Sequence, residues 1–256
     1  MTVALIDNGS LEPAAHWNLR TVAAALSEDA GVMVKAVSWK HSDRIPAEAF
    51  DGAHAWTLAP FIRARFARGE REFVFVPFFI SAQGAIGSAL RRDLEKLQRE
   101  LGEFSFTFTD GLAARGVLAP IVANRLRQTI AAKCFDRPLV ILVDHGGPSR
   151  ESADLRNAIG AEIGAFASAS MEGAHPPLLV DELRRDIYRN RDVVIAMLFL
   201  SPGRHAGASG DVAQICRASG VRCHLTALVG DHPAVVAALA GALRDALPKE
   251  AGNYVS

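Results

Sequence analysis

Short apolar runs alternate with longer amphipathic segments along the whole chain. The apolar runs predict strands at residues 3–7, 32–39, 73–80, 104–109, 139–143, 193–200 and 221–228. The amphipathic segments predict helices at residues 57–68, 86–101, 117–132, 152–166, 177–189, 211–218 and 233–247, and an earlier helix that contains Leu19, Val22, Ala23 and Leu26. The pattern leaves the segment just after Phe166 unassigned between strand and loop.

The predicted strands are apolar on both faces, which is typical of parallel strands with helices on each side of the sheet. The predicted fold is therefore α/β, with doubly wound parallel sheets. Such sheets bind ligands at the carboxyl ends of their strands. Residues that directly follow a strand are thus the candidates for chemistry.

The second half of the chain repeats the first. Residues 4–10 (ALIDNGS) match residues 141–147 (ILVDHGG), and residues 76–87 match residues 197–207. The repeat predicts two similar halves, 1–135 and 136–256, that face each other across a cleft. No Gly/Ser-rich linker separates them, so we expect tight packing between the halves.

The two halves differ in residues that can do chemistry. Asn8 corresponds to His145, Ala85 corresponds to His205, and the segment that contains Lys40 corresponds to the one that contains Glu172. Two imidazoles and a carboxylate at one sheet edge can bind a divalent first-row metal or move a proton. Taken singly, each histidine could be an ordinary solvated side chain and the glutamate a surface residue. Taken together, they place the chemistry in the second half.

Composition narrows the class of protein. The chain has 256 residues, 22% of them charged, and a formal net charge of zero. This balance favours neither nucleic acid nor a membrane surface as a partner. The chain shows no secretory signal and no apolar run long enough to span a bilayer. Its three cysteines form no CxxC pair, which favours reduced thiols and a cytoplasmic location.

Four short segments resemble one known family. They are residues 144–147 (DHGG), 170–172 (SME), 199–205 (FLSPGRH) and 230–233 (GDHP). They are similar to segments of the class II tetrapyrrole chelatases of the two-domain type, the sirohydrochlorin cobaltochelatases and ferrochelatases. The resemblance covers both halves, and the duplicated layout is itself a trait of the family. The chain departs from many two-domain members, which keep their histidines in the first half.

The resemblance implies a lyase that inserts a divalent metal into a metal-free tetrapyrrole in cobalamin or sirohaem biosynthesis. His145 and His205 would bind the ion and accept pyrrole protons, with Glu172 as an acidic partner. The metal would be Co²⁺ or Fe²⁺, or else Ni²⁺, and no nucleotide or redox cofactor would be needed. Arginines at the rim would bind the substrate's carboxylates, and polar residues of the first half would line the opposite wall. The candidate substrate-binding residues are Asn8, Ser10, Ser81, Arg150, Ser201 and Arg204. An ordinary solvated side chain is an equal interpretation of the two arginines, and a helix cap is the stronger interpretation of Ser10.

Three other functions remain open or are disfavoured. The glycine-rich segment 203–210 could hold a phosphate, but it lacks the Gly-Lys-Ser/Thr ending of a P-loop. A periplasmic-type binding protein shares the two-lobed layout, but the missing signal sequence disfavours it. A non-catalytic carrier of a tetrapyrrole or metal on the same fold is the main alternative. A single chain with both halves could act as a monomer.

Overall fold

The computed structural model describes residues 1–81 and 85–247, and it contains two parallel four-stranded sheets. The first sheet has the order β2-β1-β3-β4 and the second the order β6-β5-β7-β8. The strands of the first are β1 (Thr2–Asp7), β2 (Val34–Ser38), β3 (Glu72–Pro77) and β4 (Ser105–Phe108). Those of the second are β5 (Leu139–Gly147), β6 (Ala167–Gly173), β7 (Asp192–Met197) and β8 (Arg222–Leu225). The matching orders confirm the predicted α/β fold and its duplication.

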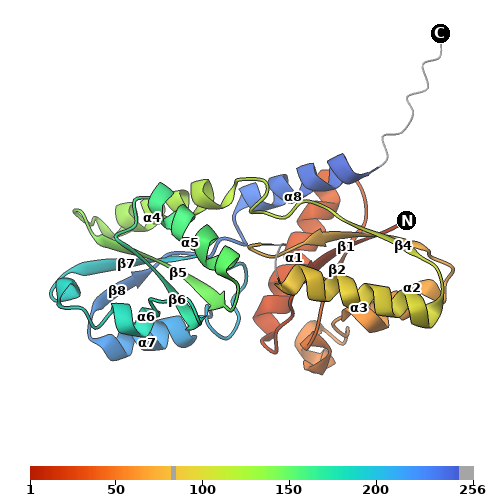
Figure 1. Cartoon of the computed structure of the whole chain (residues 1–256), viewed down its shortest axis with the longest axis horizontal. Helices are drawn as coiled ribbons and strands as arrows, with labels where there is room; N and C mark the ends of the chain where they lie inside the picture. The colour runs from red at the N-terminus through yellow and green to blue at the C-terminus, as the bar shows by residue number, and fades with distance from the viewer. Residues whose placement is uncertain (82–84, 248–256) are drawn as a thin grey trace, which may run out of the picture.

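Helices cover both faces of each sheet (Figure 1). They are α1 (Pro13–Ala30), α2 (Leu58–Phe66), α3 (Ala85–Leu101), α4 (Leu118–Lys133), α5 (Arg150–Glu162), α6 (Leu179–Glu182), α7 (Asp211–Ser219) and α8 (Pro233–Ala246). Short 3₁₀ turns lie at Ser42–Arg44, Ala47–Phe50 and Asp186–Tyr188.

Burial on both faces explains why the strands are almost continuously apolar. In β1, Leu5 belongs to a core cluster that extends into the second half, while Ile6 belongs to a cluster within the first half. In β5, Leu142 belongs to the shared cluster and Val143 to one within the second half. Because neighbouring residues of a strand point to opposite faces, each face of a sheet needs its own apolar set.

The last helix of each half packs on the other half. Helix α4 contacts β7 and α5, and α8 contacts α1 and β3 (Figure 1). Arg125 on α4 donates from Nε to the carbonyl of Leu228 at 3.0 Å and forms an ion pair with Asp231. Strands β1 to β4 precede residue 135 and β5 to β8 follow it. The boundary at residues 135 and 136 stays a prediction, because the helices on its two sides exchange places.

Two segments differ from the sequence prediction. The unassigned residues after Phe166 form the edge strand β6. The predicted helix at 177–189 is wrong: only α6 and the 3₁₀ turn Asp186–Tyr188 form there. The carbonyl of Pro177 accepts a hydrogen bond from Ser170 N at 3.0 Å, which holds the start of the segment extended. The buried carboxylate of Glu182 then accepts from the Tyr188 hydroxyl and closes a compact loop.

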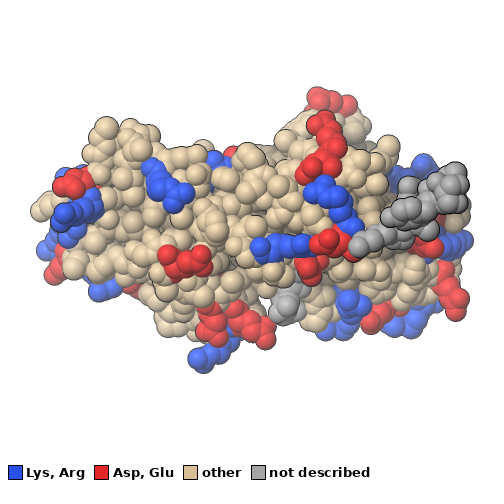
Figure 2. Space-filling model, turned by 90° about the horizontal axis from the view of Figure 1, so that it is seen from above, with Lys and Arg blue, Asp and Glu red and all other residues tan. Residues whose placement is uncertain are grey.

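Helix length and the distribution of surface charge bear on the expected partners of the protein. Within the described ranges, the helices are too short or too polar to cross a bilayer. The face in Figure 2 carries basic and acidic side chains in small, separate groups rather than one continuous basic area. The expected lack of a nucleic-acid partner stays a prediction.

Candidate metal centre

The carboxyl end of β5 carries His145 and pairs closely with the end of β6, which carries Glu172. Gly146 is opposite Glu172 in this parallel register. Gly146 has φ +83°, and a Cβ there would lie only 1.8 Å from the carbonyl oxygen of Glu172. Only glycine fits such a close approach at a positive φ. Gly146 therefore fixes the backbone of Glu172 beside that of His145.

The first half has the same backbone arrangement with different side chains. Gly9 has φ +86°, and a Cβ there would lie 1.7 Å from the carbonyl oxygen of Lys40. Lys40 thus occupies the place of Glu172, as the repeat predicts, and the exposed Asn8 occupies that of His145. Ala85 begins α3, but its side chain lies outside the described residues.

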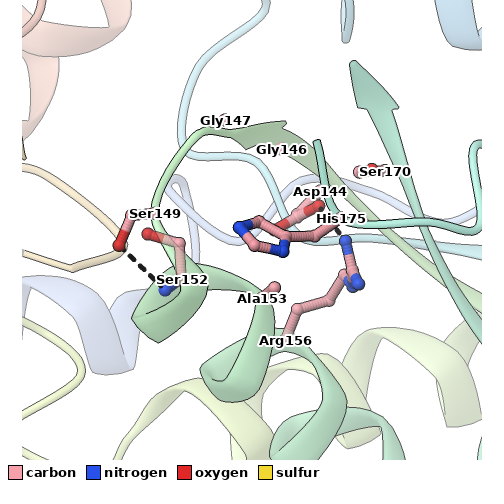
Figure 3. Close-up of a pocket in the computed structure, with 9 residues that line it drawn as sticks. All are labelled: Asp144, Gly146, Gly147, Ser149, Ser152, Ala153, Arg156, Ser170 and His175. Atoms are coloured by element: carbon pink, nitrogen blue, oxygen red, sulfur yellow. Dashed lines mark hydrogen bonds and ion pairs between the residues drawn. The ribbon is translucent and has the colours of Figure 1, made fainter. Parts of the chain in front are cut away.

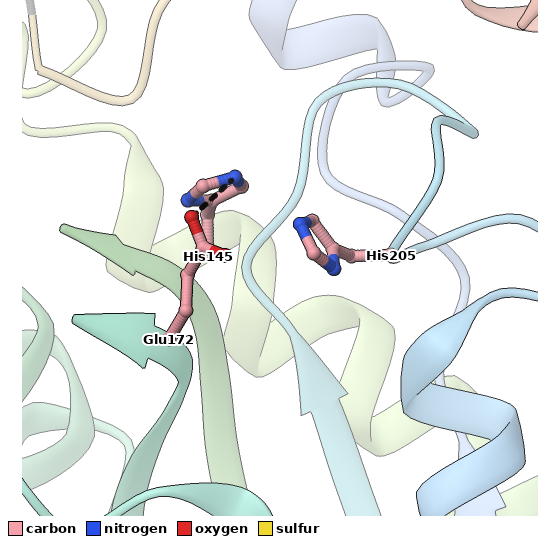
Figure 4. A group of neighbouring side chains, drawn as sticks. All are labelled: His145, Glu172 and His205. Atoms are coloured by element: carbon pink, nitrogen blue, oxygen red, sulfur yellow. Dashed lines mark ion pairs between the residues drawn. The ribbon is translucent and has the colours of Figure 1, made fainter.

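His145, Glu172 and His205 converge (Figure 4). One potential ligand atom from each lies within 4.8 Å of the other two. Nε2 of His145 is 3.7 Å from Oε1 of Glu172. The two imidazole rings are 4.6 Å apart between centroids and nearly perpendicular, at 83°. The side chains of His145 and Glu172 are 55% and 57% exposed, so a large ligand could reach them.

Neighbouring acceptors leave one nitrogen of each histidine available. Nδ1 of His145 lies 3.2 Å from the carbonyl of Gly146, so an Nδ1–H donates there. Nδ1 of His205 lies 2.8 Å from Oδ2 of Asp211, the first residue of α7. An Nδ1–H tautomer would suit both oxygens, although the approach of His205 Nδ1 to Asp211 lacks the geometry of a hydrogen bond. This tautomer leaves the lone pair on Nε2. Both rings can therefore offer Nε2 to a metal ion or a proton.

The surroundings of His205 favour its neutral form. Burial, together with the neighbouring His145, lowers the pKa of His205 below its ordinary value of 6.5. Asp211 and Glu172 act in the opposite direction and raise this pKa. A neutral imidazole at physiological pH can serve as a metal ligand and as a proton acceptor.

The three side chains provide nitrogen and oxygen ligands for a first-row divalent ion. Ligand bonds of nitrogen and oxygen to such ions are about 2.0–2.2 Å long. Small rotations of two exposed side chains would bring atoms now within 4.8 Å around one ion. Their exposure leaves room for further ligands from outside the protein, as a site that exchanges its metal requires.

A buried ion pair joins the end of β5 to helix α5, next to the site (Figure 3). Asp144, directly before His145, is 3.4 Å from Nη1 of Arg156 on α5, and the Arg156 side chain is only 1% exposed. Arg156 also donates from Nε and Nη2 to Oδ1 of Asn157, at 3.2 Å each. Burial raises the pKa of Asp144, and Arg156 opposes that shift. The pair anchors the strand residue next to His145 to helix α5.

Among the described residues of the first half, Asp7 and Arg20 form no corresponding pair. Arg20, the repeat counterpart of Arg156, has its guanidinium 4.6 Å from the centre of the Phe50 ring and donates to the carbonyls of Ala53 and His54. Asp7, the counterpart of Asp144, is buried and accepts from Gly9 N at 3.0 Å. Burial raises its pKa to about 6. The first half thus keeps the buried carboxyl but not its cation.

We expect Asp7→Asn to stabilise the protein at neutral pH. The folded state raises the pKa of Asp7 from 3.8 to about 6, so the carboxyl's stabilising effect is complete below about pH 4 and is lost as pH rises through 6. A shift of that size corresponds to about 3 kcal/mol as an upper bound. Urea unfolding at about pH 4.5 and 7.5 measures this, with the exposed Asp43→Asn as control. Equal destabilisation of Asp7→Asn at both values would contradict the expectation.

The implied substrate-binding residues of the second half lie around the His205 loop and the start of α5. Arg204 is 80% exposed, and its Nε is 3.3 Å from Oδ2 of Asp211, the carboxylate that also contacts His205. Arg150 is 84% exposed beside Asp154. Ser201 accepts a hydrogen bond from Asn18 of the first half at 2.9 Å. Their role in binding substrate stays a prediction.

The candidate substrate-binding residues of the first half follow the ends of β1 and β3. Ser10 accepts from Glu12 N at 3.0 Å, just before α1, although the residue at the N-cap position is Glu12. Asn8 is exposed, and Ser81 is partly buried at the limit of the described segment. Ser10 lies beside the His205 loop, because a Cβ built at Gly203 would be 3.7 Å from Oγ of Ser10.

Sequence reasoning missed three residues that support the site. Asp211 was visible only as the first residue of a predicted helix, Arg156 only as part of the repeated motif, and Asn18 likewise. A clue existed for Arg156, because it shares the buried face of α5 with Ala153 and Ile159. No sequence signal paired Asp211 with His205.

Comparison with known proteins defines the fold. No protein-family model and no curated protein sequence matches the chain. Solved structures do match over nearly its whole length. CbiX, described as the terminal enzyme of sirohaem biosynthesis in denitrifying bacteria, has 18% identity and a TM-score of 0.68, with 97% of this chain and 100% of that one covered.

The sirohydrochlorin chelatase SirB gives the same result. Its cobalt complex, from Bacillus subtilis subspecies spizizenii, has 14% identity and a TM-score of 0.63, with 96% of this chain and 95% of that one covered. SirB from Bacillus subtilis with Fe³⁺ has 12% identity and a TM-score of 0.61 over the same shares, 96% and 95%. The chain therefore has the two-halved fold of the sirohydrochlorin chelatases.

Proposed function

We propose that this protein is a chelatase of the class II tetrapyrrole family that inserts a divalent metal into sirohydrochlorin or a related tetrapyrrole. The observation that carries the proposal is the convergence of His145, Glu172 and His205 at the strand ends of one half. The same fold occurs in CbiX and in SirB, the latter with cobalt or Fe³⁺ bound. The fold and the donor set thus support one activity independently.

The reaction requires a ligand set and a proton acceptor, and the site supplies both. Insertion forms bonds from the ion to pyrrole nitrogens and releases two pyrrole protons, without a change of oxidation state. Nε2 of His145 and of His205 would first hold the ion and then accept protons as it leaves for the macrocycle. Glu172 would balance the charge of the ion beside His145. Nucleotide hydrolysis and redox chemistry have no part in these steps.

The substrate would lie over the exposed edge of this site, against the first half. The arginines Arg150 and Arg204 would pair with substrate carboxylates. To do so, Arg204 would break its contact with Asp211, and Asp211 would then contact His205 alone. The first half would contribute a wall from Asn8, Ser10 and Ser81, opposite Ser201.

The ligand set suits several first-row ions. Imidazole and carboxylate bind Fe²⁺, Co²⁺ and Ni²⁺ with affinity that rises in that order, so geometry and cellular supply help to decide between them. We propose cobalt or iron as the substrate, in cobalamin or sirohaem biosynthesis, and a monomer as the working unit because one chain carries both halves.

Turnover with sirohydrochlorin tests the proposal. The protein is incubated with excess sirohydrochlorin and either Co²⁺ or Fe²⁺, and the absorption of the macrocycle is followed against a protein-free control. Conversion of many substrate molecules per protein supports an enzyme. Binding that stops at one equivalent, without metal insertion, would instead indicate the carrier function on the same fold.

We expect the insertion rate to fall as the pH drops into the imidazole range. Protonation of His205 removes both its metal-binding lone pair and its ability to accept a proton, and its lowered pKa puts this loss below pH 6.5. The profile of kcat/KM between about pH 5 and 8 measures it. A rate that stays constant down to about pH 5 would argue against imidazole as the proton acceptor.

A further inference from the structure

Helix α1 of the first half is hydrogen-bonded to the loop that carries His205. Nδ2 of Asn18 donates to the carbonyl of Leu200 at 3.0 Å and to Oγ of Ser201 at 2.9 Å. Leu200 and Ser201 begin the segment that leads from β7 to His205. Figure 1 shows α1 on the side of the first half that adjoins the second. Asn18, from the half that carries none of the three candidate metal ligands, thus contacts the loop that carries His205.

The loop is held together between these contacts and His205. The amide of Gly203 donates to Ser201 O at 2.8 Å, and that of Gly207 donates to Gly203 O at 2.9 Å. The carbonyl of His205 accepts from Val212 N at 3.1 Å, which ties the histidine to helix α7. Because these bonds link consecutive parts of the loop, a shift at Ser201 would also move His205.

The same carbonyl also has a close contact with the second half. A Cβ at Gly230 would lie 1.8 Å from the carbonyl oxygen of Leu200, so the chain after β8 lies directly against the segment that follows β7. Val229 N donates to Phe199 O at 2.9 Å in the same place. The Leu200 carbonyl is therefore in contact with both Gly230 and Asn18, one from each half.

We propose that Asn18 is a positioning residue, which sets where His205 stands relative to His145 and Glu172 by fixing the start of its loop. His145 and Glu172 lie on paired strands, whereas His205 lies on a loop and needs support from outside it. Asn18 acts only through Leu200 and Ser201. The inference rests on the proposed function for its link to turnover, but its effect on metal binding stands apart from turnover.

Arg244 provides a control for the possibility that Asn18 only holds the two halves together. Nη1 of Arg244 on α8 donates to the carbonyl of Asp29 at 3.1 Å and lies 3.5 Å from its Oδ1. This contact also links a second-half residue to the first half, but it does not touch the His205 loop. Arg244→Ala therefore reports what the loss of one such contact does to the fold alone.

The experiment compares Asn18→Ala, Asn18→Asp and Arg244→Ala in the full chain. Asp at position 18 keeps the size of the side chain but has no N–H to donate to Leu200. The measurements are the Kd for Co²⁺ without tetrapyrrole, the visible spectrum of the bound Co²⁺, kcat and KM for insertion, and Tm. We expect both Asn18 variants to weaken Co²⁺ binding and to lower kcat, each about tenfold, with an altered Co²⁺ spectrum and a nearly unchanged KM.

Arg244→Ala should change Tm at most, with the Co²⁺ spectrum and kcat of the unmodified protein. The inference is overturned if the Asn18 variants keep the Kd and spectrum of the unmodified protein, or if Arg244→Ala changes them equally. Failure of the proposed function looks different. In that case no variant turns over, while the Co²⁺ measurements still decide the role of Asn18.

Discussion

His145→Ala and His205→Ala should each lower the rate of metal insertion about a thousandfold or more while the protein stays folded. Each substitution removes an imidazole that acts as both metal ligand and proton acceptor, and the remaining carboxylate of Glu172 cannot replace either Nε2. His145 is too exposed to support the core. His205 lies in a loop, but its side chain is only 13% exposed, so the Tm of His205→Ala has to be measured together with its rate. Circular dichroism and Tm check the fold, and the absorption change of sirohydrochlorin gives the rate.

The exposed His54 supplies the control for this pair. It lies in the first half, and its described contact is made by its backbone carbonyl, which accepts from Arg20. His54→Ala should retain full activity, which separates loss of the metal ligands from loss of any one imidazole. Full activity in either His145→Ala or His205→Ala would overturn the proposed function.

The sequence was sufficient for the sheets because their signal is local. The run from Ile141 to Val143 is apolar at every position, and each of its faces lies in a separate core. The paired glycines Gly9 and Gly146 occupy matching close approaches in the two halves. Gly9 and Gly146 keep the register between the copies, so Asn8 could be matched with His145. Spacing alone favoured a surface residue at Glu172, and its place beside His145 was expected from the family resemblance.

The rest depends on contacts between distant segments. The apolar pattern of 177–189 favours a helix, but Ser170 binds the carbonyl of Pro177 and draws the start of the segment toward β6. The helical pattern of α4 and α8 gives no hint that each packs on the opposite half. Asn18 lies 183 residues from Ser201 along the chain. Periodicity predicts which face of a helix is buried, but not the element against which it is buried.

Arg156→Met should destabilise the fold by about 3 kcal/mol, close to the low end of what the loss of one partner of a buried ion pair costs. Asp144 would remain buried without its cation, and Oδ1 of Asn157 would lose two donors. For a chain of this size the loss corresponds to a Tm lower by roughly 10 °C. Urea unfolding and thermal scans at neutral pH measure it.

Two further variants test whether the loss of stability comes from the broken ion pair, from the loss of a large side chain or from a change in helix α5. Arg150→Met removes an arginine of the same helix that is 84% exposed, and it should leave stability nearly unchanged. Asp144→Asn combined with Arg156→Met should recover most of the lost stability, since it removes the unpaired charge that Arg156→Met leaves buried. The first half already resembles the Arg156→Met variant, because Asp7 is buried without a paired cation and burial raises its pKa to about 6. If the double variant were as unstable as Arg156→Met alone, lost packing rather than the unpaired charge would be the cause, and Arg156 would support the strand beneath His145 by its volume alone.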